Sequence, residues 1–327
     1  MEALASVLTI ELLNSGIRLA TPIILAALGG ALCNKAGVLN LALESMMLLG
    51  AFLGIVMAFY TGSTPLGILI AVVAGGGMGA LFAFLYHRYK VDLIILAIAL
   101  NLIILELTVY MMRVLFGQVG SWSDPSIVRL PDIDLPLIKD IPVIGGVLSG
   151  YNFIVYFSWI AVAVLYVVLY HTKFGRHIRA VGENKEAAET VGINARRIQT
   201  LALIISGMLA ALGGAFLSVG HLKLFTRNMS NGRGWVAIAA ALFGLNHPIG
   251  TFFAGLFFGF AEAFAVRIQN VTDLPPNLVE LLPNLATLIV LIVIALREQI
   301  AKGVARARFR AQVRAAQTIA SQSATGD

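Results

Sequence analysis

The sequence has little charge and almost no cysteine. Only 12% of its 327 residues are charged and 59% are hydrophobic, whereas a soluble domain averages about 25% charged and 45–50% apolar residues. A soluble surface cannot be built from so few polar residues, so the surplus apolar residues must face lipid. The single cysteine, Cys33, excludes a disulfide within the chain and a metal site built from thiolates.

The chain also lacks the sequence motifs of common catalytic sites. It contains no G-x-x-x-x-G-K-[ST], H-E-x-x-H, C-x-x-C or G-x-S-x-G pattern, so it cannot hold ATP in a phosphate loop of its own. Its histidines are scattered without ligand spacing: His87, His171, His177, His221 and His247. We therefore predict no enzyme activity, no resident metal and no cofactor.

What the chain does have is a series of long apolar runs. About 20 apolar residues cross a bilayer as a helix, and such runs lie at 17–33, 38–60, 65–86, 91–115, 152–170, 200–219, 249–268 and 281–297. The run 235–245 is shorter and predicts a half-length helix. We expect an all-α polytopic membrane protein with about 8–10 transmembrane helices. Several glycines in these runs allow close helix packing: Gly75, Gly76, Gly77, Gly79, Gly213 and Gly214.

The basic residues predict how the chain is oriented. The net charge of +6 does not indicate a nucleic-acid partner, because Lys and Arg concentrate in the cytoplasmic loops of membrane proteins. The segments 87–90, 171–199 and the tail after Arg297 are basic and are predicted to be cytoplasmic. The loops 116–151 and 220–233 are then external. If 235–245 crosses, there are about nine crossings, an external N-terminus and a cytoplasmic C-terminus. Residues 1–300 form one transmembrane domain and 301–327 a basic tail on the lipid headgroups.

The basic segment 171–199 has the features of a small folded module. Asn184 is a good N-cap for a short helix of about two turns, Gly192 suits a left-handed stop, and Asn194 can cap the following helix. Ala187 and Ala188 would give the short helix a small, smooth face. An ordinary amphipathic linker is the alternative interpretation.

The spacing in this module resembles that of the permeases of the ribose, branched-chain amino acid and nucleoside type of bacterial ATP-binding-cassette (ABC) importer. Those permeases share a loop of the form G-R-x-x-R-A-x-G-x-N-x-x-A-A-x-x-x-G-I, which starts here at Gly175. The resemblance implies that the short helix is a coupling helix that sits in a cleft of an ATPase subunit. The implied coupling residues are Gly175, Arg176, Arg179, Gly182, Glu183, Asn184, Ala187, Ala188 and Gly192.

The resemblance covers most of the chain and is closest to the nucleoside, simple-sugar-like branch. It extends over Ala20–Gly30, Gly37–Phe52, Ser206–Ala215 and Gly234–Gly250, with Ser45 in place of the usual glycine. It implies a permease domain in a bacterial cytoplasmic membrane that imports nucleosides by alternating access. The implied partners are ABC ATPase subunits that bind ATP and Mg²⁺, a second homologous permease subunit and a substrate-binding lipoprotein. Simple sugars and branched-chain amino acids are the alternative substrates.

Polar and aromatic residues within the apolar runs are candidates for the substrate path. Ionisable side chains in a bilayer usually face the protein interior or a wet cavity, and Asn40 is predicted to lie one helical turn before Glu44. Such residues can instead lock helices together. Aromatic residues could stack on a base or anchor a helix at the interface. The candidates are Asn40, Glu44, Asn101, Glu106, Trp235, Phe243 and Glu262.

A rival hypothesis is an ion-coupled secondary transporter with Glu44 or Glu106 as a proton carrier. Such a protein would need no ATPase, and the module at 171–199 would have no special role. A membrane-embedded enzyme is disfavoured because the sequence contains no catalytic constellation.

Overall fold

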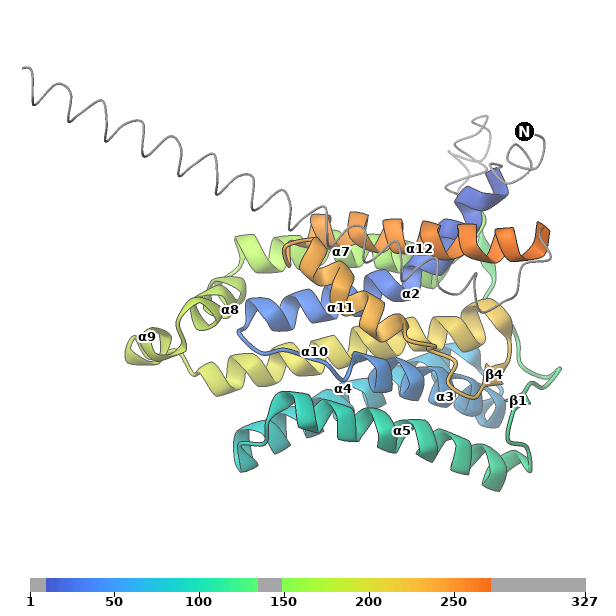
Figure 1. The fold of residues 1–327 in the computed structure, drawn as a ribbon, viewed down its shortest axis with the longest axis horizontal. Helices are drawn as coiled ribbons and strands as arrows, with labels where there is room; N and C mark the ends of the chain where they lie inside the picture. The colour runs from blue at the N-terminus through green and yellow to red at the C-terminus, as the bar shows by residue number, and fades with distance from the viewer. Residues whose placement is uncertain (1–9, 135–148, 272–327) are drawn as a thin grey trace, which may run out of the picture. The chain divides into compact units, whose positions relative to one another are not determined.

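The computed structural model describes residues 10–134 and 149–271. All of them lie in the first of two compact units, Met1–Leu274 and Pro275–Asp327. The described elements (Figure 1) are α2 (Ile10–Lys35), α3 (Leu43–Thr61), α4 (Thr64–Tyr89), α5 (Leu93–Phe116), β1 (Ser121–Trp122), β2 (Asp132–Ile133), β3 (Tyr151–Asn152), α7 (Phe153–His171), α8 (Lys173–Glu183), α9 (Lys185–Thr190), α10 (Ala195–Ala215), the π-helix η1 (Phe216–Leu222), β4 (Phe225–Thr226), α11 (Arg233–Phe243) and α12 (Pro248–Val271).

Seven helices of the described residues are long and apolar enough to cross a membrane, which confirms the predicted all-α polytopic fold. The π-helix η1 continues α10, so that Ala195–Leu222 forms one of these seven spans. The predicted half-length helix is α11, which has 11 residues. The expected crossing at 281–297, the domain boundary at 300 and the basic tail lie outside the described residues.

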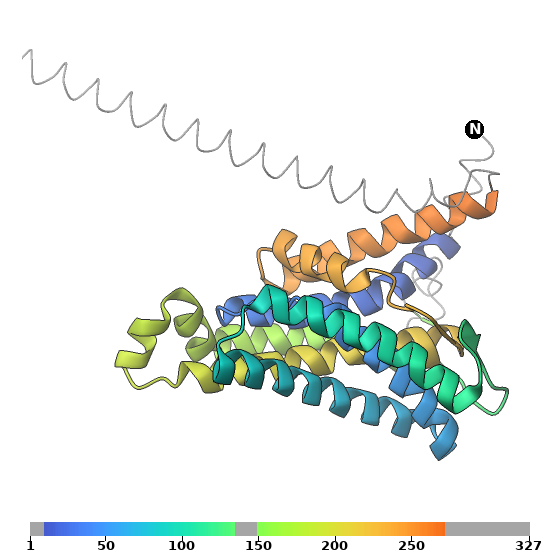
Figure 2. The same ribbon diagram turned by 60° about the horizontal axis from the view of Figure 1, so that its bottom comes forward.

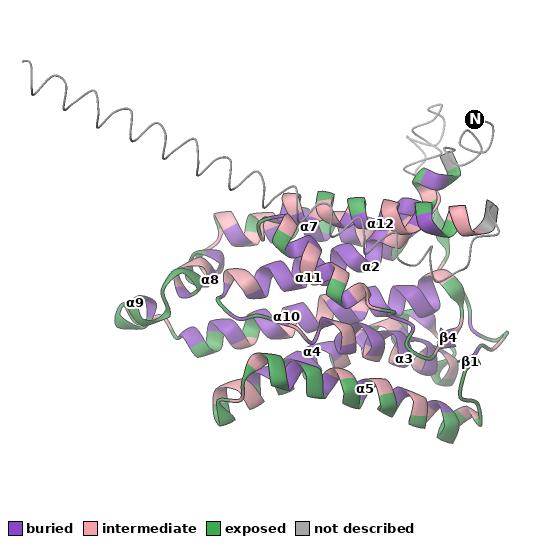
Figure 3. Ribbon diagram, viewed as in Figure 1, coloured by how far each residue is buried: buried purple, intermediate pink, exposed green. Residues whose placement is uncertain are grey.

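The interior of this unit is built from α2, α3 and α10, whereas α5 lies at its surface (Figure 3). The most apolar window of α2 is 89% buried and that of Ala195–Leu222 is 78% buried, against 28% for α5. The exposed span is the most apolar of the three, with a mean hydropathy of 2.5 against 1.7 for α2 and 2.1 for Ala195–Leu222. An apolar helix that is mostly exposed needs lipid or another protein against it.

Small residues allow the interior helices to approach one another closely. A Cβ atom added to Gly214 of α10 would lie 1.8 Å from the carbonyl oxygen of Met47 in α3, and one added to Gly75 of α4 would lie 2.4 Å from the Gly207 carbonyl oxygen. This is the predicted role of these glycines, since helices in a bilayer associate through close backbone packing. Gly77 is an exception, because no atom lies within 4 Å of a Cβ there.

Replacing Gly214 with alanine is expected to destabilise the protein, because α3 and α10 would have to move apart. We expect a loss of about 2 kcal/mol or more, the range of overpacked cores. The thermal unfolding midpoint of the purified chain measures this. Gly77→Ala is the matched control and should be neutral or slightly stabilising, since alanine favours helix. Equal midpoints for the two variants would contradict the close packing at Gly214.

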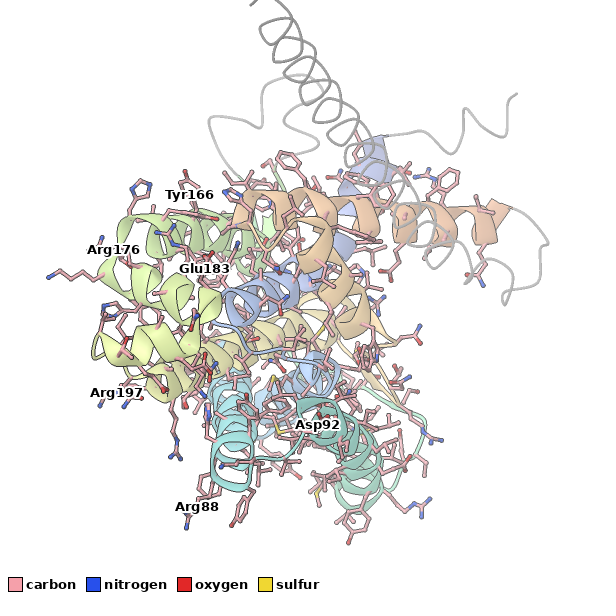
Figure 4. All side chains as sticks on the ribbon, turned by 60° about the vertical axis from the view of Figure 1, so that its left-hand side comes forward. Arg88, Asp92, Tyr166, Arg176, Glu183 and Arg197 are labelled. Carbon is pink, nitrogen blue, oxygen red and sulfur yellow. The ribbon has the colours of Figure 1, made fainter. Side chains whose placement is uncertain are left out.

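The two described segments that are predicted to be cytoplasmic, 87–90 and 171–199, share one end of the helices. Figure 4 turns this end toward the viewer, and Arg88 at the end of α4, Arg197 of α10 and Arg176 of α8 are spread along it. A surface hollow there is lined by Ala83 and Phe84 of α4 and, at the start of α10, by Asn194, Arg196, Arg197 and Thr200. We call this the basic end. The prediction that 87–90 and 171–199 lie on the same side is confirmed.

The two loops predicted to be external meet at the opposite end, which we call the β1 end. Strand β1 pairs with β4 in antiparallel fashion, with Trp122 opposite Phe225, and β2 pairs with β3. Trp122 is buried and stacks on Phe116 at 3.7 Å between ring centroids. The loops 116–151 and 220–233 are therefore on the same side, as expected.

Two of the crossings contain a non-helical stretch, and this corrects one prediction. Residues 36–42 leave the basic end without helical structure, and α3 begins only at Leu43 (Figures 1 and 2). Asn40 therefore precedes the helix and is not one turn before Glu44 on a helical face. Its carboxamide oxygen accepts from the Ala42 N–H at 3.1 Å, which competes with helix formation, as Asn side chains commonly do.

The second broken crossing runs in the opposite direction. Residues 227–232 lead inward from β4, with left-handed backbone at Asn228, Asn231 and Gly232. The short helix α11 then runs to the basic end, where His247 lies 5.2 Å from the Tyr170 ring. Helix α11 is about 16 Å long at 1.5 Å per residue, roughly half a bilayer core. Non-helical backbone at such depth is tolerated only where protein or a wet cavity surrounds it.

Candidate functional site

The N-termini of α3 and α11, the helices of the two broken crossings, meet at Glu44. Its Oε1 accepts from the Gly232 N–H at 2.9 Å, and its Oε2 accepts from the Gly234 N–H at 2.7 Å. These are main-chain donors at the start of α11, which have no partner within the helix. Glu44 also lies in the first turn of α3. Both helix N-termini favour a negative charge there.

Only glycine fits at the position that Glu44 contacts. A Cβ atom on Gly234 would lie 2.4 Å from the Glu44 nitrogen and 2.7 Å from its Oε2. The sequence G-R-G at 232–234 thus brings the main chain of α11 against α3. Glu44 holds the two broken crossings together, because its two carboxylate oxygens bond to the neighbouring helix.

A second acid holds the same turn of α11 from the other side. Arg233 is the first residue of α11, where the helix dipole disfavours a cation, and it forms an ion pair with Glu262 of α12. Its Nη1 also donates to the Met229 and Ser230 carbonyl oxygens at 3.3 and 3.4 Å. Sequence reasoning missed Arg233. The available signal was an arginine between two glycines directly before an apolar run.

Two asparagines among the candidates fix the stretch that leads into α3. Asn40 is 2% exposed, and its amide donates to the Ser206 hydroxyl of α10 at 2.9 Å. Asn101 of α5 accepts from the Ser45 N–H at 3.0 Å and donates to the Leu41 carbonyl oxygen at 3.3 Å. Asn101 thereby attaches the exposed helix α5 to the start of α3. Asn40 faces the interior.

The remaining candidates differ in exposure. Glu106 of α5 pairs with Arg227 at 3.4 Å, and its side chain is 65% exposed. Trp235 is 47% exposed, directly after the turn of α11 that Glu44 contacts. Phe243 stacks on Phe258 of α12, with 5.6 Å between ring centroids. Glu44 of α3 therefore contacts the start of α11, next to Trp235, and Asn101 of α5 contacts the start of α3. Phe243 instead packs against α12.

The module between α7 and α10 has the two predicted N-caps. Asn184 accepts from the Ala187 N–H at 2.9 Å to cap α9, and Asn194 caps α10 in the same way. Thr172 caps α8, which was not predicted from the sequence. Gly192 has φ +85°, the left-handed stop that glycine accommodates. Helix α9 has only six residues, slightly less than the two turns expected.

The two alanines of α9 do not share one surface, which corrects the expected smooth face. Ala187 is exposed, whereas Ala188 is 3% exposed. Neighbouring residues in a helix point about 100° apart, so a helix packed on its own protein buries one and exposes the other. The exposed surface of α9 is made by Lys185, Glu186, Ala187, Glu189 and Thr190, with Val191 75% exposed beside them.

Helix α8 contacts one broken crossing directly and is linked to the other through Tyr170 of α7. A Cβ atom on Gly182 would lie 2.1 Å from the Lys35 carbonyl oxygen, so the end of α8 lies directly against the start of the stretch 36–42. The Arg179 guanidinium lies 5.1 Å from the centre of the Tyr170 ring. Tyr170 in turn contacts His247, in the turn after α11. Movement of α8 would therefore act on both crossings that meet at Glu44.

Other residues of the implied coupling motif have structural roles. A Cβ atom on Gly175 would lie 2.1 Å from the Val168 carbonyl oxygen, in the tight corner between α7 and α8. Arg176 and Glu183 are exposed at the basic end (Figure 4). No group of three or more His, Cys, Asp or Glu residues in the described ranges could hold a metal ion.

The fold and the paired broken crossings define a multi-pass α-helical membrane protein. The chain belongs to the family described as the permease component of branched-chain amino acid transport systems, which it matches over residues 12–295. It is thus a permease of the ABC transporter class, as the sequence resemblance indicated.

Several relatives are similar over most of their length. The guanosine ABC transporter permease protein NupQ of Bacillus subtilis is 31% identical over 284 residues, 83% of this chain and 88% of that one. The nucleoside ABC transporter permease protein NupC of Lactococcus lactis is 31% identical over 289 residues, again 83% and 88%. A glucose ABC transporter permease protein of Haloferax volcanii is 30% identical over 283 residues, 82% and 73%.

Proposed function

We propose that this chain is the transmembrane subunit of an ABC importer that translocates nucleosides by alternating access, driven by partner ATPase subunits. The observation that carries the mechanism is the link of α8 to both broken crossings. The first link is direct, from Gly182 to Lys35, and the second runs from Arg179 through Tyr170 of α7 to His247. A force on α9 then reaches the point where α3 and α11 meet. The chain contributes two states of different stability and no bond chemistry.

The exposed surface of α9 is the proposed docking site for the ATPase subunit, which binds ATP and Mg²⁺. This surface is at the basic end, which faces the cytoplasm of a bacterial cell if basic loops follow their usual rule. The C-terminus is cytoplasmic in the same proposal. The loops of the β1 end would receive a substrate-binding lipoprotein.

The substrate path is proposed along the face between α5 and α11. Trp235 is exposed directly after Gly234, which donates to Glu44, and Leu39 and Leu242 are exposed as well. Such a face on an otherwise lipid-facing helix suits a second, homologous permease subunit, with the path at the contact between the two. Glu106 and Arg227 would line its outer part. Phe243, which packs against α12, and Glu262 of α12, which pairs with Arg233, would support the path without lining it.

A nucleoside is the preferred substrate because two of the reported relatives bear the names of guanosine and nucleoside permeases. The glucose permease relative keeps a simple sugar as the second candidate.

The test is uptake into proteoliposomes that contain this chain with its ATPase, second permease and binding protein. Labelled guanosine should enter only with internal ATP and Mg²⁺, and unlabelled nucleosides should compete whereas glucose and leucine should not. Competition by glucose alone would show that the transported substrate is a sugar and not a nucleoside. Uptake that ignores ATP and stops when the proton gradient collapses would establish the secondary transporter instead.

A further inference from the structure

A cavity at the β1 end lies away from the face between α5 and α11. It has a volume of about 630 Å³ and is bounded by the first turns of α2, the π-helix η1, the start of α11 and the last turns of α12. We call it the Arg18 pocket. Its lining residues are Leu12, Ser15, Arg18, Leu19, Leu217, His221, Leu222, Met229, Arg233, Glu262, Ala263, Val266 and Arg267.

The charge of the Arg18 pocket is positive. Three guanidinium groups line it against one carboxylate, Glu262, which is occupied by Arg233. Arg267 pairs with Glu11 at 3.1 Å, but the Glu11 side chain is 80% exposed, and an exposed ion pair is weak and easily exchanged. Arg18 donates to the neutral Gly150 carbonyl oxygen at 2.9 Å and has no carboxylate partner within the described ranges. The pocket therefore suits a ligand that carries a negative charge.

The walls and rim of the pocket are apolar. Leu12, Leu19, Leu217 and Met229 form its walls, and the rim residues Leu222 and Val266 are 50% and 47% exposed. Helix α12 has an exposed apolar stripe that includes Phe253, Phe257 and Phe264. An exposed apolar stripe on a membrane helix meets lipid or another protein, and we take lipid as its neighbour here. The mouth of the pocket thus opens between apolar side chains, which favours a ligand delivered from the bilayer over a soluble anion.

The depth of the pocket fits the headgroup region. Ser15 and Arg18 are in the first turns of α2, and Arg267 is in the last turns of α12, so the basic groups lie near the end of two crossing helices. Basic groups at that depth attract anionic lipid headgroups. Arginine suits phosphate because its N–H donors form paired, charge-assisted hydrogen bonds.

We propose that the Arg18 pocket binds an anionic phospholipid, with its phosphate between Arg18, His221 and Arg267 and an acyl chain over Leu222 and Val266. The site would tie the open ends of α2 and α12 to η1, next to the first turn of α11. The proposal does not depend on the transported substrate or on the ATPase partner.

The full chain, purified in a neutral maltoside detergent, can be titrated with short-chain phosphatidylglycerol. Binding is followed by the thermal unfolding midpoint and by native mass spectrometry. Phosphatidylglycerol is expected to raise the midpoint and to appear as a bound adduct. Short-chain phosphatidylcholine, inorganic phosphate and glycerol 3-phosphate should bind at least about tenfold more weakly, because each lacks either the net charge or the acyl chains.

Three variants separate the pocket from general surface charge. Arg18→Gln should weaken phosphatidylglycerol binding about tenfold, the scale of one charge-assisted hydrogen bond. Ser15→Trp keeps every charge but fills the cavity, so it should also abolish binding, and Ser15 is exposed enough to accept the ring. Arg227→Gln removes a charge at the same end outside the pocket and should leave binding unchanged.

Four results would overturn the proposal. Equal binding of phosphatidylcholine would show that charge is not recognised. Equal binding of inorganic phosphate would show a soluble-anion site. A loss in Arg227→Gln as large as in Arg18→Gln, or full binding by a folded Ser15→Trp variant, would show that the lipid associates with the surface and not with the cavity.

Discussion

Glu44→Gln is expected to destabilise the protein and to abolish transport in the fraction that folds. A glutamine has the same shape, but its NH₂ group would face one of the two main-chain N–H donors of Gly232 and Gly234 that the carboxylate now accepts from. One N–H loses its partner inside the protein, and the charge that complements two helix N-termini is lost. A buried donor without a partner costs about 1–3 kcal/mol and more when a charge was involved.

The expected total loss is therefore about 2–4 kcal/mol in unfolding free energy, measured as a lower thermal midpoint in detergent. Transport should fall further than the amount of folded protein, because α11 would no longer be held at α3. The transport measurement uses the reconstituted system described above, with uptake normalised to the inserted protein.

Glu106→Gln is the matched control for this change. It removes the same charge from an acid that is 65% exposed and paired with Arg227 at 3.4 Å, and such exposed pairs contribute at most about 1 kcal/mol. Its midpoint should stay near that of the unmodified chain. If Glu44→Gln melts like the unmodified chain, the two hydrogen bonds do not hold α11. If only the yield falls and the inserted protein transports normally, Glu44 is purely structural.

Ala187→Trp is expected to separate ATP hydrolysis from uptake without unfolding the permease. Ala187 is exposed on α9 and its side chain contributes nothing to the buried core, so an indole there changes the surface offered to the ATPase. A bulky group in a closely packed contact costs several kcal/mol in the worst geometry and about 1–3 kcal/mol typically. Uptake per ATP hydrolysed should fall at least about tenfold, which corresponds to 1.4 kcal/mol.

Two control variants define what this result means. Ala188→Trp changes the neighbouring buried position and should lower the thermal midpoint of the permease itself. Val128→Trp adds the same ring at an exposed apolar residue of the β1 end and should leave co-purification of the ATPase unchanged. Normal coupled uptake in Ala187→Trp, with the ATPase still bound, would refute the docking assignment of α9.

The local structure of the basic module could be predicted from the sequence because capping is a short-range interaction. Asn184, Gly192 and Asn194 act on residues within three or four positions, so a single sequence contains all the partners. The short length of α11 was also predictable, because the length of an apolar run can be read from the sequence and an 11-residue run is too short to cross a bilayer as helix. The irregular residues 227–232 that extend this crossing were not predictable in this way.

The candidate polar residues were identified because they interrupt apolar runs, and this criterion does not show what each side chain contacts. An apolar run with an acid or amide in it shows that the side chain needs a partner, but not which one. In the structure, Asn40 bonds to Ser206, Glu44 to Gly232 of the α11 N-terminus and Glu106 to Arg227. These partners are 166, 188 and 121 residues apart along the chain. Asn40 was wrongly placed on the α3 face because its helix starts later than the apolar run does.

By itself, the sequence determined that this protein is embedded in lipid, roughly how many times it crosses the bilayer, that its described basic loops share one side, and its family. These depend on composition, run length and short motifs, all of which act locally or along the membrane normal. Only the tertiary structure decided that two crossings are broken, that Glu44 closes the break, that Ala187 and not Ala188 is free to meet a partner, and that three arginines surround one cavity. Each of these is a contact between residues far apart in the chain, and their meeting depends on how the helices pack.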